Sequence, residues 1–351
     1  LPNASTLKLG MVHPLPHDLI RKFAAQVDTL YVIEELDPFI EDQVKAMGIA
    51  AVGKEIIPLC GELTPGRLRS AFGLPQPAAI PADKLPGRPP NMCHGCPHRG
   101  VFYALNQLKA YVTGDIGCYT LGFMPPLSAM DTCVCMGASV GMATGVTKVV
   151  SAEEKKKVVA VIGDSTFLHT GMNGLMDMVY NNAPATLIIL DNSITAMTGR
   201  QDNPASGFTL MDDPSHAINI PLLCKALGVK NIRVINPLDL EETRRVIAEE
   251  MERPEPSVII TKSPCVLLPE MKKRKDKELY LIVSEKCTGC RTCLKLGCPA
   301  IEWVPLTPEE AKKLGYKEKQ KGYSRINATL CFGCGQCAPL CKFKAISVTE
   351  K

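Results

Sequence analysis

The residues of this chain that could do the most chemistry are its sixteen cysteines, many of which fall in two short runs. "CTGCRTCLKLGCP" begins at Cys287, and "CFGCGQCAPLC" begins at Cys331. Each run opens with three cysteines at repeated C-x-x-C spacing, which lets one short loop wrap three corners of a cubane iron–sulfur cluster. Neither run contains a histidine, and zinc sites usually offer two C-x-x-C pairs or added histidines. The runs therefore predict iron–sulfur clusters in preference to a pair of zinc knuckles.

The spacing also predicts which cysteines share a cluster. In two-cluster ferredoxins the fourth cysteine of each run ligates the other cluster. Two features depart from that pattern. The number of residues before the last cysteine differs between the two runs, and an insert at residues 300–330 separates the runs. We expect a bacterial-type ferredoxin domain with two [4Fe-4S] clusters over residues 279–351. The first cluster would be held by Cys287, Cys290, Cys293 and Cys341, and the second by Cys298, Cys331, Cys334 and Cys337.

Composition limits the class of protein. The chain has 351 residues, of which 46% are hydrophobic, so it can bury a large core and divide into two or three domains. A net charge of +4 is too close to neutral to indicate nucleic acid or a lipid surface as a partner. No apolar stretch approaches the roughly 18 residues of a membrane span, and no signal peptide is visible. Clustered cysteines in a large chain favour metal over disulfides, so we expect a cytoplasmic protein.

A second constellation lies in the middle of the chain. "KKVVAVIGDSTF" is an apolar run that ends in Gly163-Asp164-Ser165, and "ATLIILDNSITAMTG" is another that contains Asp191-Asn192. Because helical spacing separates the two runs, we expect an α/β fold with a parallel sheet, which would bring Asp164 and Asn192 into neighbouring loops. A carboxylate, an amide oxygen and a backbone carbonyl suit Mg²⁺ bound to a diphosphate. The alternative is that these residues only form turns or cap helices.

The pattern Gly163-Asp164-Ser165 with Asp191-Asn192-Ser193 resembles the Gly-Asp-Gly to Asn-Asn pattern of thiamine-diphosphate enzymes, with serine in place of the third glycine. The resemblance implies that Asp164, Asn192 and the carbonyl of Ile194 hold Mg²⁺. It also implies that the cofactor is contacted by Cys93, Gly95, Gly117, Gly163, Asp164, Ser165, Asn192, Ile194 and Thr195.

Four further stretches narrow the family: "CHGCPHRG" from Cys93, "TGDIGCYTLG" from Thr113, "DTCVCMGASVGMATG" from Asp131 and "GDSTFLHTGMNGL" from Gly163. Together with the paired cysteine runs they resemble the large (alpha) subunit of indolepyruvate:ferredoxin oxidoreductase over essentially the whole chain. The resemblance implies oxidative decarboxylation of aryl pyruvates to aryl-acetyl-CoA, as in anaerobic metabolism. Thiamine diphosphate and Mg²⁺ would be the cofactors, coenzyme A would take the acyl group, and [4Fe-4S] clusters would pass electrons to ferredoxin.

The resemblance also sets the expected domains. Residues 1–63 resemble a small transketolase C-terminal-like α/β domain, with a strand and turn expected at 7–16, a helix at 17–27 and a buried strand at 29–35. A proline-rich linker (64–90), the diphosphate-side thiamine domain (91–269), a charged linker (270–278) and the ferredoxin domain (279–351) follow. The N-terminal domain of the family is not recognisable, and the chain begins at Leu1. We therefore expect a hetero-oligomer in which a beta subunit, or a preceding part of a longer polypeptide, completes the thiamine site.

A third cluster is an open expectation. Related 2-oxoacid:ferredoxin oxidoreductases bind one near the thiamine, and the matching cysteines would be Cys93, Cys96, Cys118 and Cys265. The alternatives are that "CHGCPHRG" is only a phosphate-side loop, or that the chain has only the two tail clusters by which the family is commonly described. We expect the remaining cysteines to be small buried hydrophobic residues, namely Cys60, Cys133, Cys135 and Cys224.

Three histidines in the motif loops, His94, His98 and His169, could hydrogen-bond the carboxylate or keto oxygen of a substrate near the thiazolium. Each could equally be a satisfied polar residue. Three other functions stay open beside the leading one. They are an electron-transfer subunit without thiamine, a 2-oxoacid:ferredoxin oxidoreductase with a different substrate, and a non-oxidative thiamine decarboxylase or synthase, which would have no use for the tail cysteines.

Overall fold

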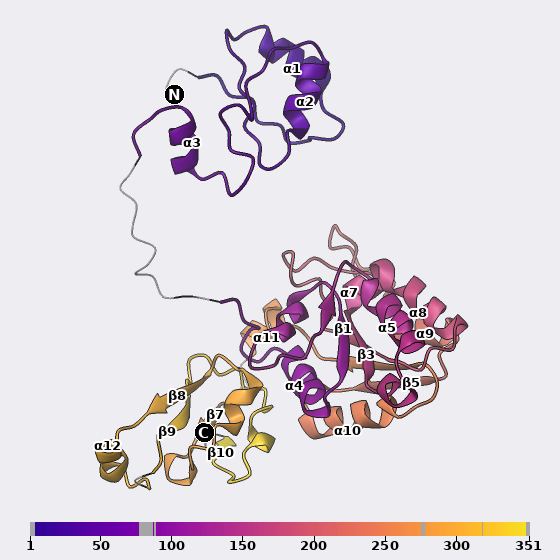
Figure 1. The fold of residues 1–351 in the computed structure, drawn as a ribbon, viewed down its shortest axis with the longest axis vertical. Helices are drawn as coiled ribbons and strands as arrows, with labels where there is room; N and C mark the ends of the chain where they lie inside the picture. The colour runs from indigo at the N-terminus through magenta and orange to yellow at the C-terminus, as the bar shows by residue number, and fades with distance from the viewer. Residues whose placement is uncertain (1–3, 77–86, 88, 275–277, 318, 349–351) are drawn as a thin grey trace. The chain divides into compact units, whose positions relative to one another are not determined.

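The computed structural model describes residues 4–76, 87, 89–274, 278–317 and 319–348, and the chain divides into two compact units, Leu1–Arg88 and Pro89–Lys351 (Figure 1). The first unit contains helices α1 (His17–Ala24), α2 (Phe39–Ala46) and α3 (Pro65–Ala71). The second contains the remaining elements, so the expected thiamine and ferredoxin domains pack together as one unit. No helix in the described part of the chain is long and apolar enough to cross a membrane.

The first unit is less regular than the sequence predicts. The helix expected at 17–27 is present, but the strands expected at 7–16 and 29–35 are not strands in the described residues. A strand needs a hydrogen-bonded partner along its length. Here Val32 N donates to the carbonyl of Val52 and Val52 N to that of Leu30, which makes only the isolated parallel bridge Tyr31↔Val52. The apolar residues expected in strands instead pack around Leu15, Ile20 and neighbouring side chains.

We expected residues 64–90 to form a linker, but this proline-rich segment begins with a helix. Thr64 Oγ1 accepts a hydrogen bond from Arg67 N at 3.3 Å and Pro65 follows at the first helical position, so this sequence starts helix α3. The Phe72 ring then meets Tyr31 edge-on, with 5.1 Å between ring centroids. The segment therefore begins as part of the first unit, and positions 77–86 and 88 lie outside the described residues.

The second unit is built on a parallel sheet in the order β2-β1-β3-β4-β6-β5, in which every adjacent pair is parallel. The strands are β1 (Tyr111–Gly114), β2 (Thr132–Cys133), β3 (Val158–Gly163), β4 (Thr186–Asp191), β5 (Asn231–Ile235) and β6 (Ser257–Lys262). Strands β3 and β4 are buried along their whole length, as expected for a parallel sheet that is covered on both faces. The α/β fold predicted from the alternating runs is confirmed.

Two layers of helices cover the sheet (Figure 1). On one face, residues of α4 (His98–Leu108) and α10 (Leu240–Met251) share a core with Val159 and Val161. On the other face, α5 (Ala138–Val149), α8 (Met172–Tyr180) and α9 (Ile220–Ala226) share a core with Ala160 and Ile162. Short elements complete this part of the unit: η2 (Cys118–Phe123), α6 (Ala152–Lys155), α7 (Asp164–Thr166), the π-helical turn η3 (Phe167–Gly171) and α11 (Pro269–Lys273).

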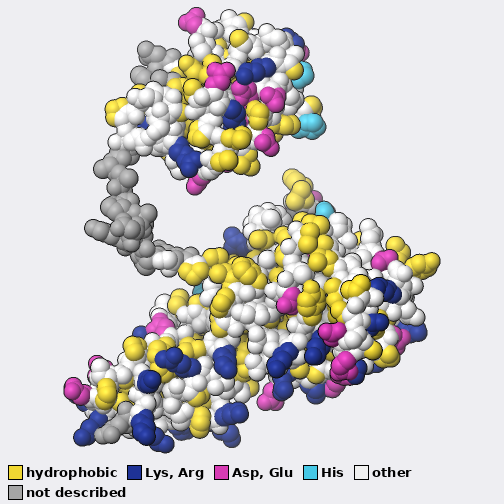
Figure 2. Space-filling model, in the orientation of Figure 1, with side chains coloured by type: hydrophobic (Ala, Val, Ile, Leu, Met, Phe, Trp, Pro, Cys, Tyr) yellow, Lys and Arg dark blue, Asp and Glu magenta, His cyan; other side chains and the backbone are white. Residues whose placement is uncertain are grey.

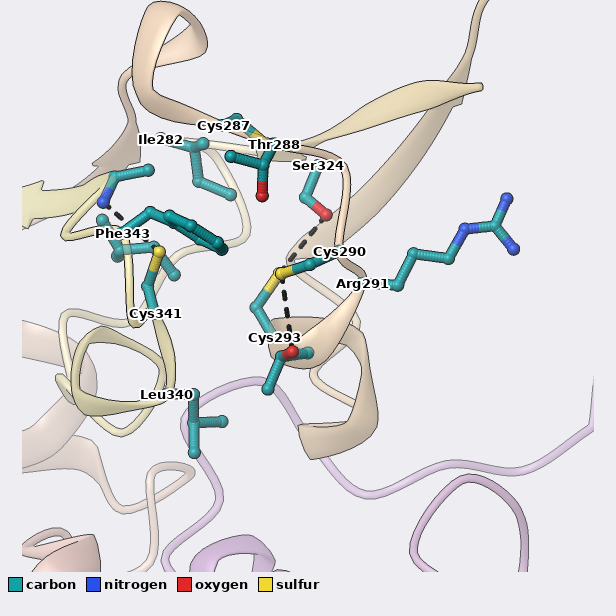
Figure 3. Close-up of a pocket in the computed structure, with 13 residues that line it drawn as sticks. Ile282, Cys287, Thr288, Cys290, Arg291, Cys293, Ser324, Leu340, Cys341 and Phe343 are labelled. Carbon is teal, nitrogen blue, oxygen red and sulfur yellow. Dashed lines mark hydrogen bonds between the residues drawn. The ribbon is translucent and has the colours of Figure 1, made fainter. Parts of the chain in front are cut away.

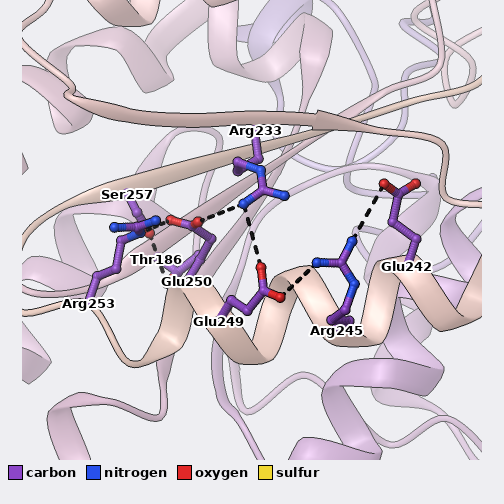
Figure 4. Close-up of polar contacts among 8 residues, drawn as sticks. All are labelled: Thr186, Arg233, Glu242, Arg245, Glu249, Glu250, Arg253 and Ser257. Carbon is purple, nitrogen blue, oxygen red and sulfur yellow. Dashed lines mark hydrogen bonds and ion pairs between the residues drawn. The ribbon is translucent and has the colours of Figure 1, made fainter.

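An ion-pair network fixes α10 to the sheet (Figure 4). The buried carboxylate of Glu250 accepts a hydrogen bond from Arg253 Nε at 2.6 Å and lies 3.7 Å from Arg233 on β5. Arg233 and Arg245 both pair with Glu249, at 3.5 and 2.7 Å. Because Glu250 is buried while its arginine partners are partly exposed, this network places a negative charge inside without an orphaned cation.

The ferredoxin part has two small antiparallel sheets. Strand β7 (Tyr280–Ile282) pairs with β10 (Ile346–Val348), and β8 (Ile301–Pro305) pairs with β9 (Gly322–Ile326). The short turn η4 (Ser284–Lys286) directly precedes the first cysteine run, and η5 (Thr292–Leu296) and η6 (Ala338–Leu340) lie within the two runs. The insert at 300–330 is thus the β8–β9 hairpin, which carries helix α12 (Pro308–Lys313). The expected charged linker at 270–278 begins within α11, and residues 275–277 lie outside the described residues.

Candidate functional site

Asp164 and Asn192 lie at the same edge of the sheet. Gly163, the last residue of β3, is in register with Leu190 of β4, so the two strands end side by side. Asp164 follows Gly163 at the start of α7, and Asn192 follows β4. The prediction that these residues occupy neighbouring loops is confirmed. Carboxyl ends of parallel strands are where α/β proteins form their sites.

The Asp164 carboxylate is buried, with only 2% of the residue exposed. Burial, and then the charge of nearby Asp191, raise the pKa of Asp164 to about 7. Asn203 Nδ2 donates to Asp164 Oδ2 at 3.1 Å, and backbone hydrogen bonds from Ser165 and Ser193 also lower the pKa, but together they do not offset the effect of burial. A divalent cation would supply the missing positive charge and favour the ionised form. The chemistry of this donor therefore fits a Mg²⁺ site.

Asn192 is held by a buried histidine. Asn192 Nδ2 lies 3.2 Å from His98 Nε2, and Asn192 Oδ1 accepts a hydrogen bond from Ile194 N at 3.2 Å. Burial lowers the pKa of His98 to about 4, so the ring is neutral at pH 7 and one ring nitrogen can accept. The contact with His98 uses the amide nitrogen of Asn192. The amide oxygen of Asn192 therefore points away from His98, where it can also bind a metal.

His98 is buried beside Asn192. The residue is 3% exposed and its ring meets Tyr119 edge-on, with 6.1 Å between ring centroids. Its contacts with Asn192 and Tyr119 suit a positioning role beside the expected metal edge, and a hydrogen bond from His98 to a substrate stays a prediction. The other two histidines differ, since His94 is half-buried in the C-x-x-C loop and His169 is exposed on η3.

The remaining expected contacts of the cofactor lie around this edge. Thr195 Oγ1 donates to Ser165 Oγ at 2.8 Å, which ties the loop after β4 to the start of α7. Ile194 is buried in the same loop. These residues lie where a metal–diphosphate group would be held, and their roles stay predictions.

Two glycines expected at the diphosphate make room for a tyrosine. A Cβ on Gly117 would lie 2.3 Å from Tyr119 Cε1, and one on Gly163 would lie 2.8 Å from the same atom. The Tyr119 hydroxyl donates to the carbonyl of Ile116 at 3.0 Å, which fixes the ring between the ends of β1 and β3. Close packing of Tyr119 thus explains these glycines without a ligand, and their contact with a diphosphate stays a prediction.

The four cysteines expected at the third cluster come together. The thiols of Cys93 and Cys265 interact electrostatically with those of Cys96 and Cys118, and burial raises the pKa of Cys96 to about 12. Cys265 N donates to the carbonyl of Asn192 at 3.0 Å, so this group lies directly behind the expected metal edge. Within the described ranges, no three ligand-type side chains are arranged for a single metal ion. A cubane separates its ligand sulfurs further than a single ion does, and a cluster on these four cysteines stays a prediction.

The cysteines expected at the first tail cluster line one pocket (Figure 3). The pocket wall also includes Ser324, whose hydroxyl lies 3.3 Å from Cys293 Sγ, and Ala345, whose N–H donates to Cys341 Sγ at 3.3 Å. In the first contact Cys293 Sγ is the donor, whereas the Ala345 N–H aimed at the Cys341 sulfur favours the thiolate form that a cluster needs. The pocket brings the first cysteine run together with the last cysteine of the second, as crossed ligation requires: Cys287, Cys290, Cys293 and Cys341.

The second tail set is also gathered. Cys298, Cys331 and Cys334 all act on the thiol of Cys337, and burial raises the pKa of that thiol well above its usual range. Cys298 comes from the first run and the other three come from the second. The arrangement of the cysteines therefore supports the crossed ligand sets at both tail sites.

The other cysteines divide in a way the sequence does not predict. Cys224 is fully buried in the core, as expected. Cys60, Cys133 and Cys135 are exposed, so the expectation that they fill the core is wrong. Cys133 is the last residue of the short strand β2 at the edge of the sheet, where its thiol donates to the carbonyl of Asp115 at 3.6 Å.

Sequence reasoning missed two residues of this site. Asn203, which donates to Asp164, comes from an irregular loop, and no pattern in "QDNPASG" marks it. Asp115 is fully buried after β1, and its carboxylate accepts hydrogen bonds from the N–H groups of Gly137 and Ser139 at 2.9 and 3.0 Å. The apolar run before "TGDIG" could have marked Asp115 by the same reasoning that marks Asp164. Asp115 holds the start of α5 beside the site.

Lysine and arginine side chains spread over the visible face of the ferredoxin part, at the lower left of Figure 2. Six of the lysines that follow Pro308 are exposed and read as solvated surface: Lys312, Lys313, Lys317, Lys319, Lys321 and Lys342.

The fold and the site define a class of protein: a thiamine-diphosphate enzyme domain followed by a ferredoxin-like module. Residues 115–261 match the family model "Thiamine pyrophosphate enzyme, C-terminal TPP binding domain". Residues 279–342 match the model "4Fe-4S dicluster domain".

Similarity over nearly the whole chain identifies the family. Over 97% of this chain, the sequence is 36% identical to indolepyruvate oxidoreductase subunit IorA of Thermococcus kodakarensis. Over 98% of this chain, it is 35% identical to subunit IorA of Pyrococcus abyssi. The chain belongs to the family of these large indolepyruvate oxidoreductase subunits. It spans 56% of each of these relatives, that is, about half their length. A 2-oxoglutarate:ferredoxin oxidoreductase structure from Magnetococcus marinus aligns with 53% of this chain and 68% of its own at 21% identity, with a TM-score of 0.43.

Proposed function

We propose that this chain is part of a thiamine-dependent 2-oxoacid:ferredoxin oxidoreductase of the indolepyruvate type. One observation carries the proposal: a buried carboxylate–amide edge suited to Mg²⁺–diphosphate shares a compact unit with two crossed cysteine sets. The two parts are in contact at the Cys93–Cys96 loop, where Gln336 Nε2 donates to the carbonyl of Cys96 at 3.2 Å. Oxidation at a thiamine site needs an electron acceptor close by, and this unit would provide both.

At the thiamine site, Asp164, Asn192 and the carbonyl of Ile194 would hold Mg²⁺, and Mg²⁺ would hold the diphosphate. Thiamine diphosphate would supply the electron sink that decarboxylation of a 2-oxoacid requires. The protein's own contribution is position: neutral His98 orients Asn192, and Asn203 orients Asp164. Cys93, Gly95, Gly117, Ser165 and Thr195 are further proposed contacts of the cofactor.

For electron transfer we propose two tail [4Fe-4S] clusters on the crossed sets, and a third cluster on Cys93, Cys96, Cys118 and Cys265. The third set lies beside Asn192 and also contacts the loop of Cys334, so a cluster there would bridge the thiamine edge and the tail. Electrons would pass from the thiamine edge to the third cluster, then to the tail clusters, and leave to ferredoxin.

The substrate, acceptors and partners rest on the relatives. Their name implies indolepyruvate, and we propose aryl pyruvates as substrates with coenzyme A as acyl acceptor. The chain spans about half the length of these relatives, so we propose that another domain or a beta subunit completes the thiamine site in a hetero-oligomer. The exposed tail lysines suit an acidic ferredoxin.

The test is anaerobic analysis of the purified chain, supplied with Mg²⁺, thiamine diphosphate and its partner polypeptide. About eight irons per chain with bound thiamine supports two clusters, and about twelve supports the third. Indolepyruvate-dependent reduction of ferredoxin should require coenzyme A. Iron without thiamine would instead indicate an electron-transfer subunit, and thiamine without iron would indicate a non-oxidative enzyme.

A further inference from the structure

An arginine is buried where the thiamine part meets the ferredoxin part. Arg99, near the start of α4, has 2% of its surface exposed. Its Nη1 donates to the carbonyl oxygens of Gly297 at 2.6 Å and Leu296 at 3.3 Å, at the end of η5. Its Nη2 donates to the carbonyls of Met92 and Cys93, the latter at 3.1 Å. One guanidinium thus joins the C-x-x-C loop to the loop that leads into Cys298.

No carboxylate balances this charge. In the part of the chain that the structure describes, no ion pair joins Arg99 to an acidic side chain, and its Nε has no hydrogen-bond partner. Burial lowers the pKa of Arg99, and the side chains that oppose this effect are those of Cys96, Cys298, Cys334 and Cys93, which would be anionic as cluster ligands. Burying a guanidinium without a countercharge is strongly unfavourable. These two cysteine sets are the countercharge that the surroundings offer.

A second buried residue closes the same junction. Gln336 is 1% exposed, and its Nε2 donates to the carbonyl of Cys96 at 3.2 Å while lying 3.8 Å from Cys334 Sγ. Gly95 packs so closely against Phe332 that a Cβ on it would lie 2.5 Å from the Phe332 Cβ. The Cys93–Cys96 loop and the second cysteine run are therefore in direct contact, and Arg99 lies between the two sets of thiolates.

We propose that Arg99 is the fixed positive charge that makes the tail cluster on Cys298, Cys331, Cys334 and Cys337 easier to reduce. This inference rests on the proposed function, because it needs a cluster at that set. A cubane held by four thiolates is negatively charged, and one added electron makes it more negative. A buried cation stabilises the reduced form more than the oxidised form, because screening is weak in a water-excluded junction. Arg99 would thus raise the potential of the cluster that accepts electrons from the thiamine side.

The test is an EPR-monitored redox titration of the intact anaerobic protein, with dithionite as reductant. Arg99→Met removes the charge and keeps most of the side-chain volume, and Arg99→Lys keeps the charge. Arg253→Gln is the matched control, because Arg253 is a cation of the same compact unit, and the charged partners of Arg253 are all glutamates. A Cys334→Ser variant identifies the signal of the cluster in question.

We expect Arg99→Met to lower the midpoint potential of this cluster, with reduction less favourable by about tenfold, which is 59 mV for a one-electron couple. The cluster on Cys287, Cys290, Cys293 and Cys341 should shift less. Arg99→Lys should stay close to the wild type, and Arg253→Gln should match it. Full iron content in Arg99→Met with an unchanged potential would overturn the proposal.

Loss of the cluster in a variant is also informative. If Arg99→Met loses this cluster while Arg99→Lys retains it at a near-native potential, the positive charge is required, which supports the proposal. If both variants lose it, Arg99 acts by packing its planar fork into the junction, and the proposal is wrong. Absence of iron from the wild-type chain would instead overturn the proposed function itself.

Discussion

Asp164→Asn gives the sharpest test of the proposed metal edge, because its effect on stability should change sign with the ligand. In the metal-free protein the Asp164 carboxyl is buried beside Asp191, and its pKa is raised from 3.8 to about 7. Ionising it therefore destabilises the fold until a cation binds. Asparagine keeps the shape and can still accept the hydrogen bond from Asn203, but it carries no charge.

The magnitude follows from linkage. A pKa that is higher in the folded state gives stability that is fully present below pH 3.8 and is lost as the pH rises through about 7. The rise in the pKa of Asp164 from 3.8 to about 7 corresponds to about 4 kcal/mol of stability lost by pH 8, since each tenfold change in proton affinity is worth about 1.36 kcal/mol. Compared with the wild type without metal, the Asp164→Asn variant should gain up to that amount at pH 8 and progressively less toward pH 4.

The measurement is calorimetric unfolding under anaerobic conditions at several pH values, with and without Mg²⁺ and thiamine diphosphate. At 100 times its Kd, the ligand should stabilise the wild type by about 2.7 kcal/mol and should leave the variant unchanged. Parallel pH profiles for the two proteins would show that Asp164 is not a buried uncompensated charge. Equal stabilisation of both by Mg²⁺ and thiamine diphosphate would show that Asp164 does not hold the metal.

Other perturbations test neighbouring features. His98→Asn should remove a loss of stability, up to about 3 kcal/mol, that the wild type shows as the pH falls from 6.5 to about 4, because the buried ring resists protonation that the unfolded chain accepts; denaturant titrations across this range would measure it. Glu250→Gln should destabilise the second unit by about 1–3 kcal/mol by removing the charge that Arg253 bonds, whereas Glu249→Gln on the exposed side should cost clearly less; equal urea midpoints would contradict the network. Cys341→Ala should reduce iron by about four atoms per chain, and Cys224→Ala should not; equal iron contents would refute the ligand assignment.

Local patterns in the sequence were sufficient for the sheet and its polar edge. The apolar runs that end at Gly163 and Asp191 specify buried parallel strands, and parallel register then places Asp164 beside Asn192. Side chains brought in by irregular loops could not be predicted in this way. Asn203 reaches Asp164 from a loop with no periodicity.

The junction was beyond reach for a different reason. Arg99 bonds to Gly297, which is 198 residues away, and nothing local in "CHGCPHRG" indicates that the guanidinium turns inward. In the first unit, short apolar runs at 7–16 and 29–35 read as strands because their pattern suits one. Whether a strand forms depends on hydrogen-bonding partners from other parts of the chain, and a short segment carries no information about those partners.

The crossed cysteine sets also bear on how the tail would survive damage. The β8–β9 hairpin separates the two runs, and its exposed tip around α12 is the kind of segment that proteases cut. Each cluster would be bound by cysteine sulfurs from both sides of such a cut. The two fragments would therefore stay linked to each other through the clusters. Iron removal, and not backbone cleavage, would then be the event that releases them.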